Sequence, residues 1–144
     1  MAKLYGIGVG PGDSELLTLK ALKVLQKCEV IVAPSSTEGG RSIALDTAKQ
    51  FIRKESEIII KHFQMGGEKS EEKAYEAFQV IEEKLKQGKN VAFLTIGDPF
   101  IYSTYIHLLR YIEERGYLSE TVPGITSFCA CASLAKEALV VGDE

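Results

Sequence analysis

Short apolar runs alternate along the chain with longer stretches of helical period, and this alternation limits the possible fold more than any other feature. The runs span residues 4–9, 30–33, 58–60 and 91–96, with a weaker one at 120–122. They are rich in β-branched residues and bounded by turn residues, which predicts strands. The second, third and fourth runs are apolar on both alternating faces, as expected for a parallel sheet covered by helices on both sides.

Apolar residues recur at helical spacing between the runs, within residues 16–25, 43–52, 74–85 and 101–112. Gly88 and Gly116 stand where the third and fourth helices should end, as left-handed caps do. Right-handed crossovers would join these elements into an open, mostly parallel five-stranded sheet with helices on both faces. The predicted class is α/β, in one compact domain of 144 residues. Residues 64–70, which include a pair of glycines, are expected to form a flexible loop.

The end of the chain has a different character. Small residues follow Gly124 and predict a helix that packs closely against its neighbours. An apolar run at 139–141 then stands almost at the C-terminus, where a domain normally finishes on an element docked to its core. Either this run lies on the core unaided, or the chain has been cut from a longer one.

Composition excludes several classes of protein. The 20 acidic and 17 basic side chains give a net charge of −3, and no basic stripe could follow a phosphate backbone, so nucleic acid is not expected as a partner. The three cysteines lack the spacing of a zinc site or a disulfide framework, so no metal is expected and they are interpreted as small buried thiols. No apolar stretch of about 18 residues is present, which predicts a cytoplasmic protein without membrane contact.

Glycines repeat at every second position where the first strand meets its loop. Gly6, Gly8 and Gly10 would present one bare face of a strand, which lets another backbone or a ligand come close. The dinucleotide fingerprint G-x-G-x-x-G is not satisfied, because its third glycine would fall on Pro11 or Asp13. The alternative is structural: the glycines allow close helix packing, while Asp13 or Ser14 caps the next helix.

Two further loops follow predicted strands. Asp98 before Pro99 is typical of a helix cap, yet Gly97 at the strand end would also expose backbone groups to a polar ligand. Thr126 and Ser127 could cap the last helix or offer hydroxyls to a ligand. In a parallel sheet, loops that follow strands lie together at the carboxyl edge, which predicts one rim suited to binding and orientation rather than covalent catalysis.

The three loops together resemble the S-adenosylmethionine-dependent tetrapyrrole methyltransferases. The similarity rests on LYGIGVGPGD at residues 4–13, GDP at 97–99 and VPGITS at 122–127, in the family's order and over essentially the whole chain. Within the family the chain is most similar to the precorrin-2, or cobalt-factor II, C20-methyltransferases. Uroporphyrinogen III methyltransferases carry an aspartate proposed as proton acceptor where Pro34 stands here, so that role is not carried over and the catalytic residue is unknown.

The resemblance implies a homodimeric enzyme of cobalamin biosynthesis that methylates C20 of a tetrapyrrole. It implies two α/β domains with S-adenosylmethionine between them, so residues 1–144 would be the N-terminal domain, with the second domain absent and this chain inactive alone. The implied cofactor contacts match six positions of this sequence: Pro11, Gly97, Asp98, Ile101, Thr126 and Ser127. Asp98 is placed near the ribose or amino-acid part of the cofactor.

Other readings stay open. Methylation of another corrin carbon, diphthine synthesis and ribosomal RNA methylation fall within the same superfamily, and an isolated domain without catalytic activity is the reading outside it. Lys61 and His62, at the end of the third strand, could meet substrate carboxylates or form an ordinary solvated strand end.

Overall fold

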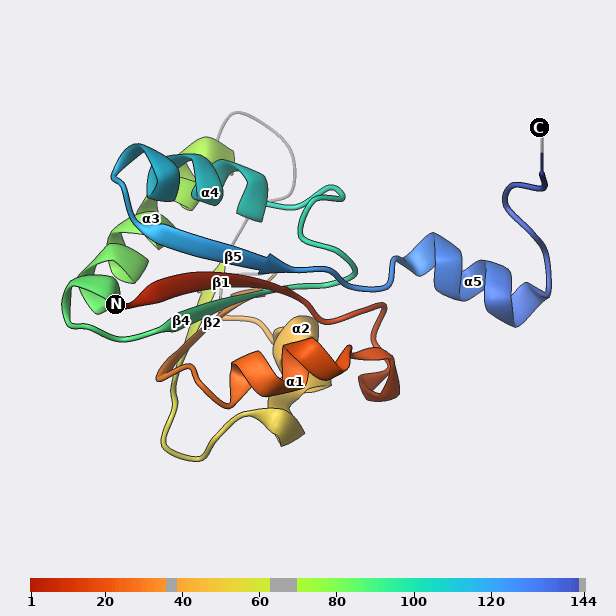
Figure 1. The fold of residues 1–144 in the computed structure, drawn as a ribbon, viewed down its shortest axis with the longest axis horizontal. Coiled ribbons are helices and arrows are strands. Elements are labelled where there is room, and N and C mark those ends of the chain that lie inside the picture. The colour runs from red at the N-terminus through yellow and green to blue at the C-terminus, as the bar shows by residue number, and fades with distance from the viewer. Residues whose placement is uncertain (36–38, 63–69, 143–144) are drawn as a thin grey trace.

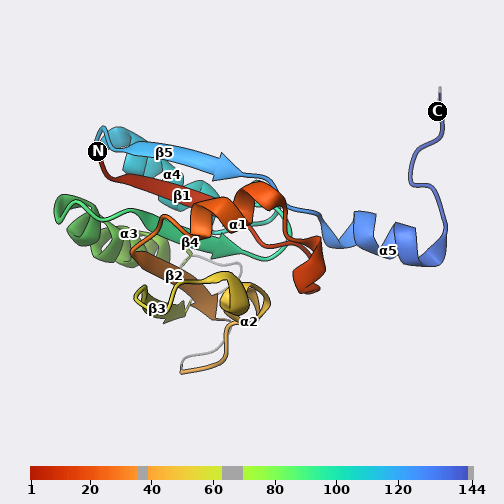
Figure 2. The same ribbon diagram turned by 60° about the horizontal axis from the view of Figure 1, so that its bottom comes forward.

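A computed structural model describes residues 1–35, 39–62 and 70–142. Five parallel strands form one sheet, as predicted, and their order in the sheet is β3-β2-β4-β1-β5 (Figures 1 and 2). Their bounds are β1 Lys3–Gly8, β2 Val30–Ser35, β3 Glu57–His62, β4 Val91–Thr95 and β5 Leu118–Val122. The expected flexible loop at 64–70 lies outside the described residues except for its last residue.

Four helices cover the sheet, two on each face (Figures 1 and 2). They are α1 Leu19–Leu25 and α2 Ile43–Ala48 on one face, and α3 Ser70–Lys86 and α4 Tyr105–Glu114 on the other. Short 3₁₀ turns, η1 Ser14–Leu16 and η2 Lys49–Phe51, precede α1 and follow α2. Gly88 and Gly116 follow the ends of α3 and α4 with φ of 80° and 76°, which confirms their prediction as left-handed caps.

Alternate residues of the central strands divide the core into two layers. Leu4 and Phe93 pack with α3 and α4, whereas Ile7 and Leu94 pack with α1 and α2. Gly6 faces α4, where a Cβ atom would lie 2.2 Å from Cζ of the fully buried Tyr105. The tyrosine ring therefore occupies the space that this glycine leaves, and its hydroxyl lies 2.9 Å from that of Thr121 on β5. Burial raises the pKa of Tyr105.

The edge strand β3 differs from the prediction of burial on both faces. Ile59 packs against the α3 and α4 layer, but Ile58 and Ile60 keep 41% and 46% of their surface exposed. Both lie on the α2 side, because they pair in register with Ile31 and Ala33 of β2. The short helix α2 does not reach over this edge.

The helix α5, Ser127–Ala135, has no buried residue and extends away from the sheet, so the prediction of close packing is wrong (Figures 1 and 2). The apolar run at 139–141 is likewise exposed. Of the three cysteines only Cys28 is buried as expected, and burial raises its pKa to about 12. Cys129 and Cys131 on α5 are exposed, contrary to the prediction, because no other described element covers this helix.

Candidate functional site

Three loops meet at the carboxyl edge of the sheet, as the parallel arrangement requires. Gly10 and Gly97 form an antiparallel bridge between the loops after β1 and β4, with N···O distances of 3.3 and 2.8 Å. The amide of Gly124, in the loop after β5, donates to the Asp98 carboxylate at 3.0 Å. The loops that carry the predicted cofactor residues are therefore joined through their backbones.

Glycine is required where these loops touch. A Cβ on Gly8 would lie 2.6 Å from the carbonyl oxygen of Gly97 and 2.7 Å from the amide nitrogen of Gly124. A Cβ on Gly124 would lie 2.0 Å from that same oxygen. All of these neighbours are backbone atoms, which cannot rotate away, so three glycines from distant parts of the sequence form one close contact. This is the close backbone approach predicted for the bare face of β1.

Asp98 holds two of the loops rather than capping a helix. Its Oδ1 accepts the amide of Phe100 at 2.9 Å and its Oδ2 accepts that of Gly124 at 3.0 Å. The next helix, α4, starts only at Tyr105, so the capping alternative for Asp98 is wrong. The carboxylate is half-buried, and each oxygen keeps a second lone pair for a ligand.

The other predicted cofactor residues lie on or beside these loops. Thr126 caps α5, accepting the Cys129 amide at 3.3 Å, which confirms the capping alternative for this residue. Ser127 follows it with an exposed side chain, Ile101 is 42% exposed, and Pro11 is half-buried in the turn after β1. Asp13 caps η1 through the amide of the second residue after it.

A pocket of about 360 Å³ lies beside the loop after β4. It opens between the ends of β2 and β4, whose outgoing connections run in opposite directions, through α2 to β3 and through α4 to β5. Such a switch point is where ligands of open α/β sheets bind. The lining residues are Pro34, Ser35, Arg41, Ile43, Phe93, Thr95, Ile96, Tyr102, Ser103 and Thr104.

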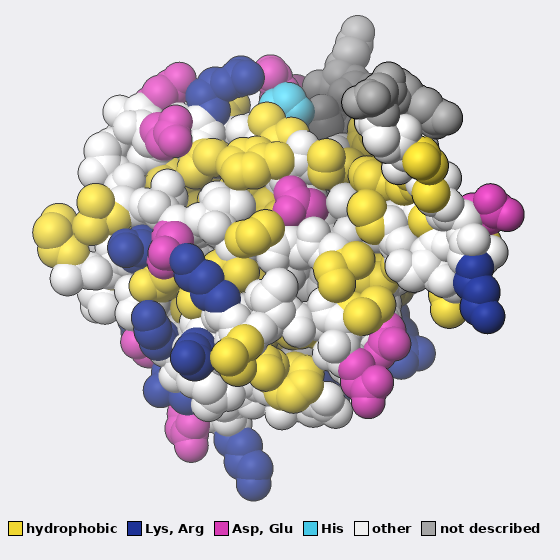
Figure 3. All heavy atoms as spheres, turned by 45° about the vertical axis from the view of Figure 1, so that its right-hand side comes forward, with side chains coloured by type: hydrophobic (Ala, Val, Ile, Leu, Met, Phe, Trp, Pro, Cys, Tyr) yellow, Lys and Arg dark blue, Asp and Glu magenta, His cyan; other side chains and the backbone are white. Residues whose placement is uncertain are grey.

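The pocket wall is largely apolar with hydroxyl groups at intervals. The hydroxyls of Thr95 and Ser103 lie 3.4 Å apart, and that of Ser103 also accepts the amide of Tyr105 at 3.0 Å. Tyr102 at the rim is 92% exposed and has a φ of 48°, a left-handed conformation that is uncommon for tyrosine. Apolar side chains are spread over this side of the molecule (Figure 3).

Sequence reasoning missed this pocket as a site. Its lining comes partly from residues after β2, and that strand end could have been placed on the predicted rim with the others. Lys61 and His62, considered as carboxylate contacts, do not line it; the Nδ1 of His62 lies 3.2 Å from the carbonyl oxygen of Ser35.

No cluster of three or more His, Cys, Asp or Glu side chains suited to a metal occurs in residues 1–35, 39–62 and 70–142. No helix within these same ranges is long and apolar enough to cross a membrane.

The sequence profile of the tetrapyrrole (corrin/porphyrin) methylases matches residues 3–144. The chain belongs to this family. A probable cobalt-precorrin-2 C(20)-methyltransferase of Methanocaldococcus jannaschii is 43% identical over 99% of the chain and 61% of its own length. The cobalt-precorrin-2 C(20)-methyltransferase of Salmonella typhimurium is 36% identical over 96% of the chain and 59% of its length.

Solved structures of the family share the fold. The crystal structure of a cobalt precorrin-4 methyltransferase matches with a TM-score of 0.78 and 29% identity, over 98% of this chain and 53% of that one. The predicted family and the predicted five-stranded α/β fold are both confirmed. The chain spans about three fifths of the length of the two curated methylases, 61% and 59%.

Proposed function

We propose that the protein transfers a methyl group from S-adenosylmethionine to C20 of precorrin-2 or its cobalt complex. The observation that carries this proposal is the identity of 43% and 36% with two relatives named for that carbon. Identity with the cobalt precorrin-4 methyltransferase is lower, at 29%. This difference in sequence identity favours precorrin-2 over precorrin-4 as the substrate.

The joined loops fit the methyl donor. The N–H and C=O of Gly97 already pair with Gly10, so the predicted exposure of these backbone groups to a ligand is wrong, and Gly97 contributes only the absence of a side chain between the loops. Asp98 offers negative charge to a cationic donor, and Ile101 offers an exposed apolar surface suited to an adenine ring. Thr126 and Ser127 add hydroxyl oxygens at the start of α5. Together with Pro11, these are the residues that would hold S-adenosylmethionine.

The pocket at the switch point fits part of the acceptor. Its volume of about 360 Å³ is at the low end for small-molecule sites, so it would take one edge of a macrocycle rather than the whole. Ile96 lines the pocket and is followed directly by Gly97, while Ile101 is followed by the pocket residue Tyr102. The segment 96–104 thus borders both proposed sites, which would bring donor and acceptor side by side.

The proposed methyl transfer depends mainly on alignment of the donor and the acceptor. When bound, S-adenosylmethionine would supply a methyl group on a positively charged sulfur. In-line attack by an electron-rich acceptor carbon would form the new carbon–carbon bond, break the sulfur–methyl bond and release S-adenosylhomocysteine, and the acceptor carbon would then lose its proton to a base. Holding two reactants in line supplies a large part of the acceleration in such a step. The bridge between Gly10 and Gly97 and the bond from Gly124 to Asp98 would fix the donor loops relative to the sheet.

The test is methyl transfer with the purified protein, methyl-labelled S-adenosylmethionine, and either precorrin-2 or its cobalt complex. We expect one labelled methyl group per macrocycle, located at C20 by NMR. Label at another carbon would replace the C20 assignment. In parallel reactions with RNA or a protein as the acceptor, label there and in neither macrocycle would overturn the tetrapyrrole substrate.

A matched pair of variants tests the donor site. Ser127→Ala should weaken binding of S-adenosylhomocysteine, measured by calorimetry, because Ser127 is exposed at the start of α5 beside the joined loops. Ser133→Ala removes a hydroxyl from the same helix that donates to the carbonyl of Cys129, and it should leave binding unchanged. Equal binding by both variants and the wild type would contradict this placement of the donor.

Binding without transfer is the second candidate function. It is favoured by the joined loops, whose contacts with one another do not involve the acceptor pocket and could hold S-adenosylmethionine without an acceptor. Calorimetry with S-adenosylhomocysteine in parallel with the transfer assay separates the two, because a binding domain alone would give heat of binding without labelled product.

A further inference from the structure

A charged side chain stands in the wall of the proposed acceptor pocket. Among the described residues that line it, Arg41 alone carries a charge, and the others are apolar, hydroxyl-bearing or tyrosine. The Arg41 side chain is 83% exposed, at the rim rather than the floor. The chain as a whole has a net charge of −3, so a cation at this rim is not a consequence of a generally basic surface.

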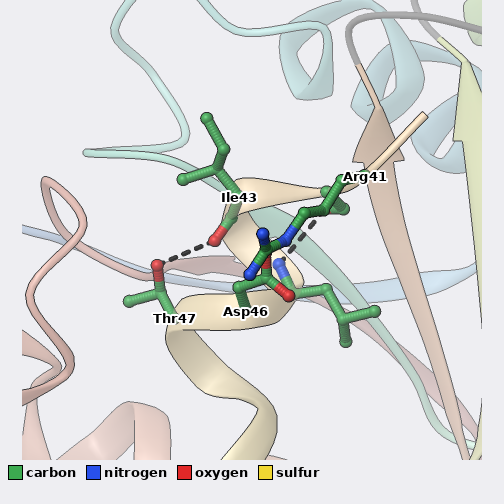
Figure 4. A network of polar contacts seen from close by, with 6 residues as sticks. Arg41, Ile43, Asp46 and Thr47 are labelled. Carbon is green, nitrogen blue, oxygen red and sulfur yellow. Dashed lines mark hydrogen bonds and ion pairs between the residues drawn. The ribbon is translucent and has the colours of Figure 1, made fainter.

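Local contacts hold the guanidinium group in place (Figure 4). Its Nε donates to Oδ2 of Asp46, one turn into α2. The start of that helix is itself fixed, because Ser42 accepts the amide of Leu45 at 3.1 Å and Thr47 donates to the carbonyl of Ile43 at 2.8 Å. Arg41 thus precedes a firmly built helix start rather than a free loop.

The contact with Asp46 uses one of the five N–H donors of the guanidinium group. The four donors on the two terminal nitrogens include a pair arranged side by side, the geometry that binds a carboxylate through both oxygens. Asp46 therefore acts as a positioning residue for Arg41.

We propose that Arg41 binds a carboxylate side chain of the tetrapyrrole acceptor at the mouth of this pocket and so selects for an acidic macrocycle edge. The inference rests on the proposed function, since it is the acceptor of that reaction which would enter the pocket. A pocket of about 360 Å³ holds only an edge of a macrocycle, so the acidic groups of that edge would lie at its rim. A carboxylate next to an apolar wall is poorly stabilised unless a cation pairs with it, and among the described residues of this wall the cation is Arg41.

Direct binding tests the inference without requiring catalysis. The purified protein is titrated with uroporphyrin III, a macrocycle with eight carboxylates, and the porphyrin fluorescence is followed. We expect Arg41→Gln to raise the dissociation constant about 10- to 100-fold, the range for a lost charge-assisted pair, and Arg41→Lys to lie in between because it keeps the charge but not the paired donors.

Lys49→Gln is the matched control, because it removes the same charge from the exposed residue that follows α2, outside the pocket lining. It should bind uroporphyrin III like the wild type. A dissociation constant for Arg41→Gln equal to that of Lys49→Gln would overturn the inference, as would failure of the wild type to bind the porphyrin.

Kinetics separate this inference from the proposed function. In the methyl-transfer assay Arg41→Gln should raise KM for the tetrapyrrole by a similar factor and leave KM for S-adenosylmethionine unchanged. If the wild type transfers no methyl group yet Arg41→Gln still weakens porphyrin binding, the proposed function fails and the carboxylate site stands. If transfer occurs but Arg41→Gln changes neither KM for the tetrapyrrole nor porphyrin binding, the proposed function stands and the carboxylate site fails.

Discussion

The contact between three glycine backbones makes a quantitative prediction about Gly8→Ala. The added methyl group would lie 2.6 Å from the Gly97 carbonyl oxygen and within 2.9 Å of two Gly124 backbone atoms. Normal contact needs roughly 1 Å more, so the loops after β4 and β5 must move away from β1. Gly8 is buried at the end of β1, and β1 is paired with β4 on one side and β5 on the other, so the strand itself cannot give way.

The cost follows from the hydrogen bonds that such a movement breaks. Two neutral bonds join Gly10 and Gly97, and one bond to a carboxylate joins Gly124 to Asp98. At about 1 kcal/mol for each neutral bond and about 2 kcal/mol for the charged one, the free energy of unfolding should fall by about 4 kcal/mol. Domains are typically stable by about 5–15 kcal/mol, so the variant should still fold, with a Tm lower by roughly 12 °C.

Urea and thermal unfolding followed by circular dichroism measure this change, with Gly12→Ala as the control. Gly12 has a φ of 127° and no neighbour within 4 Å of a Cβ, so alanine there meets only the backbone strain of about 1–2 kcal/mol. If Gly8→Ala loses no more stability than Gly12→Ala, the loops are not held by this contact and the reasoning is refuted.

Three further predictions concern the core and the charged surface. Gly6→Ala should lower the free energy of unfolding by about 3 kcal/mol, and a Tyr105→Leu background should recover part of that loss because it removes the ring that the methyl group would strike; strictly additive losses would contradict this. In the native protein at pH 8 a thiol reagent should label the two cysteines of α5 and spare Cys28, whose pKa of about 12 and burial keep it neutral and covered until urea unfolds the chain; labelling of all three thiols at one rate would contradict this. A hydrogen bond from Lys84 of α3 lowers the pKa of Glu57, so the ionised carboxylate stabilises the fold above its unfolded pKa, and this stabilisation is lost as the pH falls through the lower folded pKa. In urea titrations, Glu57→Gln should therefore lose less stability than the wild type between about pH 5 and 3. Equal losses would contradict this.

The strands and the meeting of the loops could be predicted because each depends on local sequence plus one topological rule. Runs of β-branched residues identify strands, and parallel strands must place their following loops at one edge. The bare face of β1 also followed from spacing alone. The spacing did not predict which residues contact each glycine. Gly6 packs against the ring of Tyr105, whereas Gly8 contacts the backbones of Gly97 and Gly124.

The wrong predictions all concern contacts between elements that are distant in the sequence. Periodicity reports which side chains are apolar, but not which element covers them. Ile58 and Ile60 lie on an edge strand beyond the reach of α2, and the small residues of α5 extend away from the sheet. For Asp98 the local pattern before Pro99 suits a helix cap and a loop turn equally, and its bond to Gly124, 26 residues away in sequence, decides between them.

The position of β1 between β4 and β5 explains why glycine recurs along it. Leu4, Gly6 and Gly8 lie on the same face of β1. The space over this face holds a leucine side chain at Leu4, the ring of Tyr105 at Gly6, and only backbone atoms of Gly97 and Gly124 at Gly8, where the neighbouring loops converge. The repeat is thus a consequence of how closely three strand ends approach, rather than a phosphate-binding fingerprint. Because this contact holds together the loops proposed to bind the methyl donor, a change at Gly8 should weaken donor binding as well as stability. Arg41 lies in a different loop, more than 30 residues further along the chain, so a change there should weaken binding of the acceptor alone.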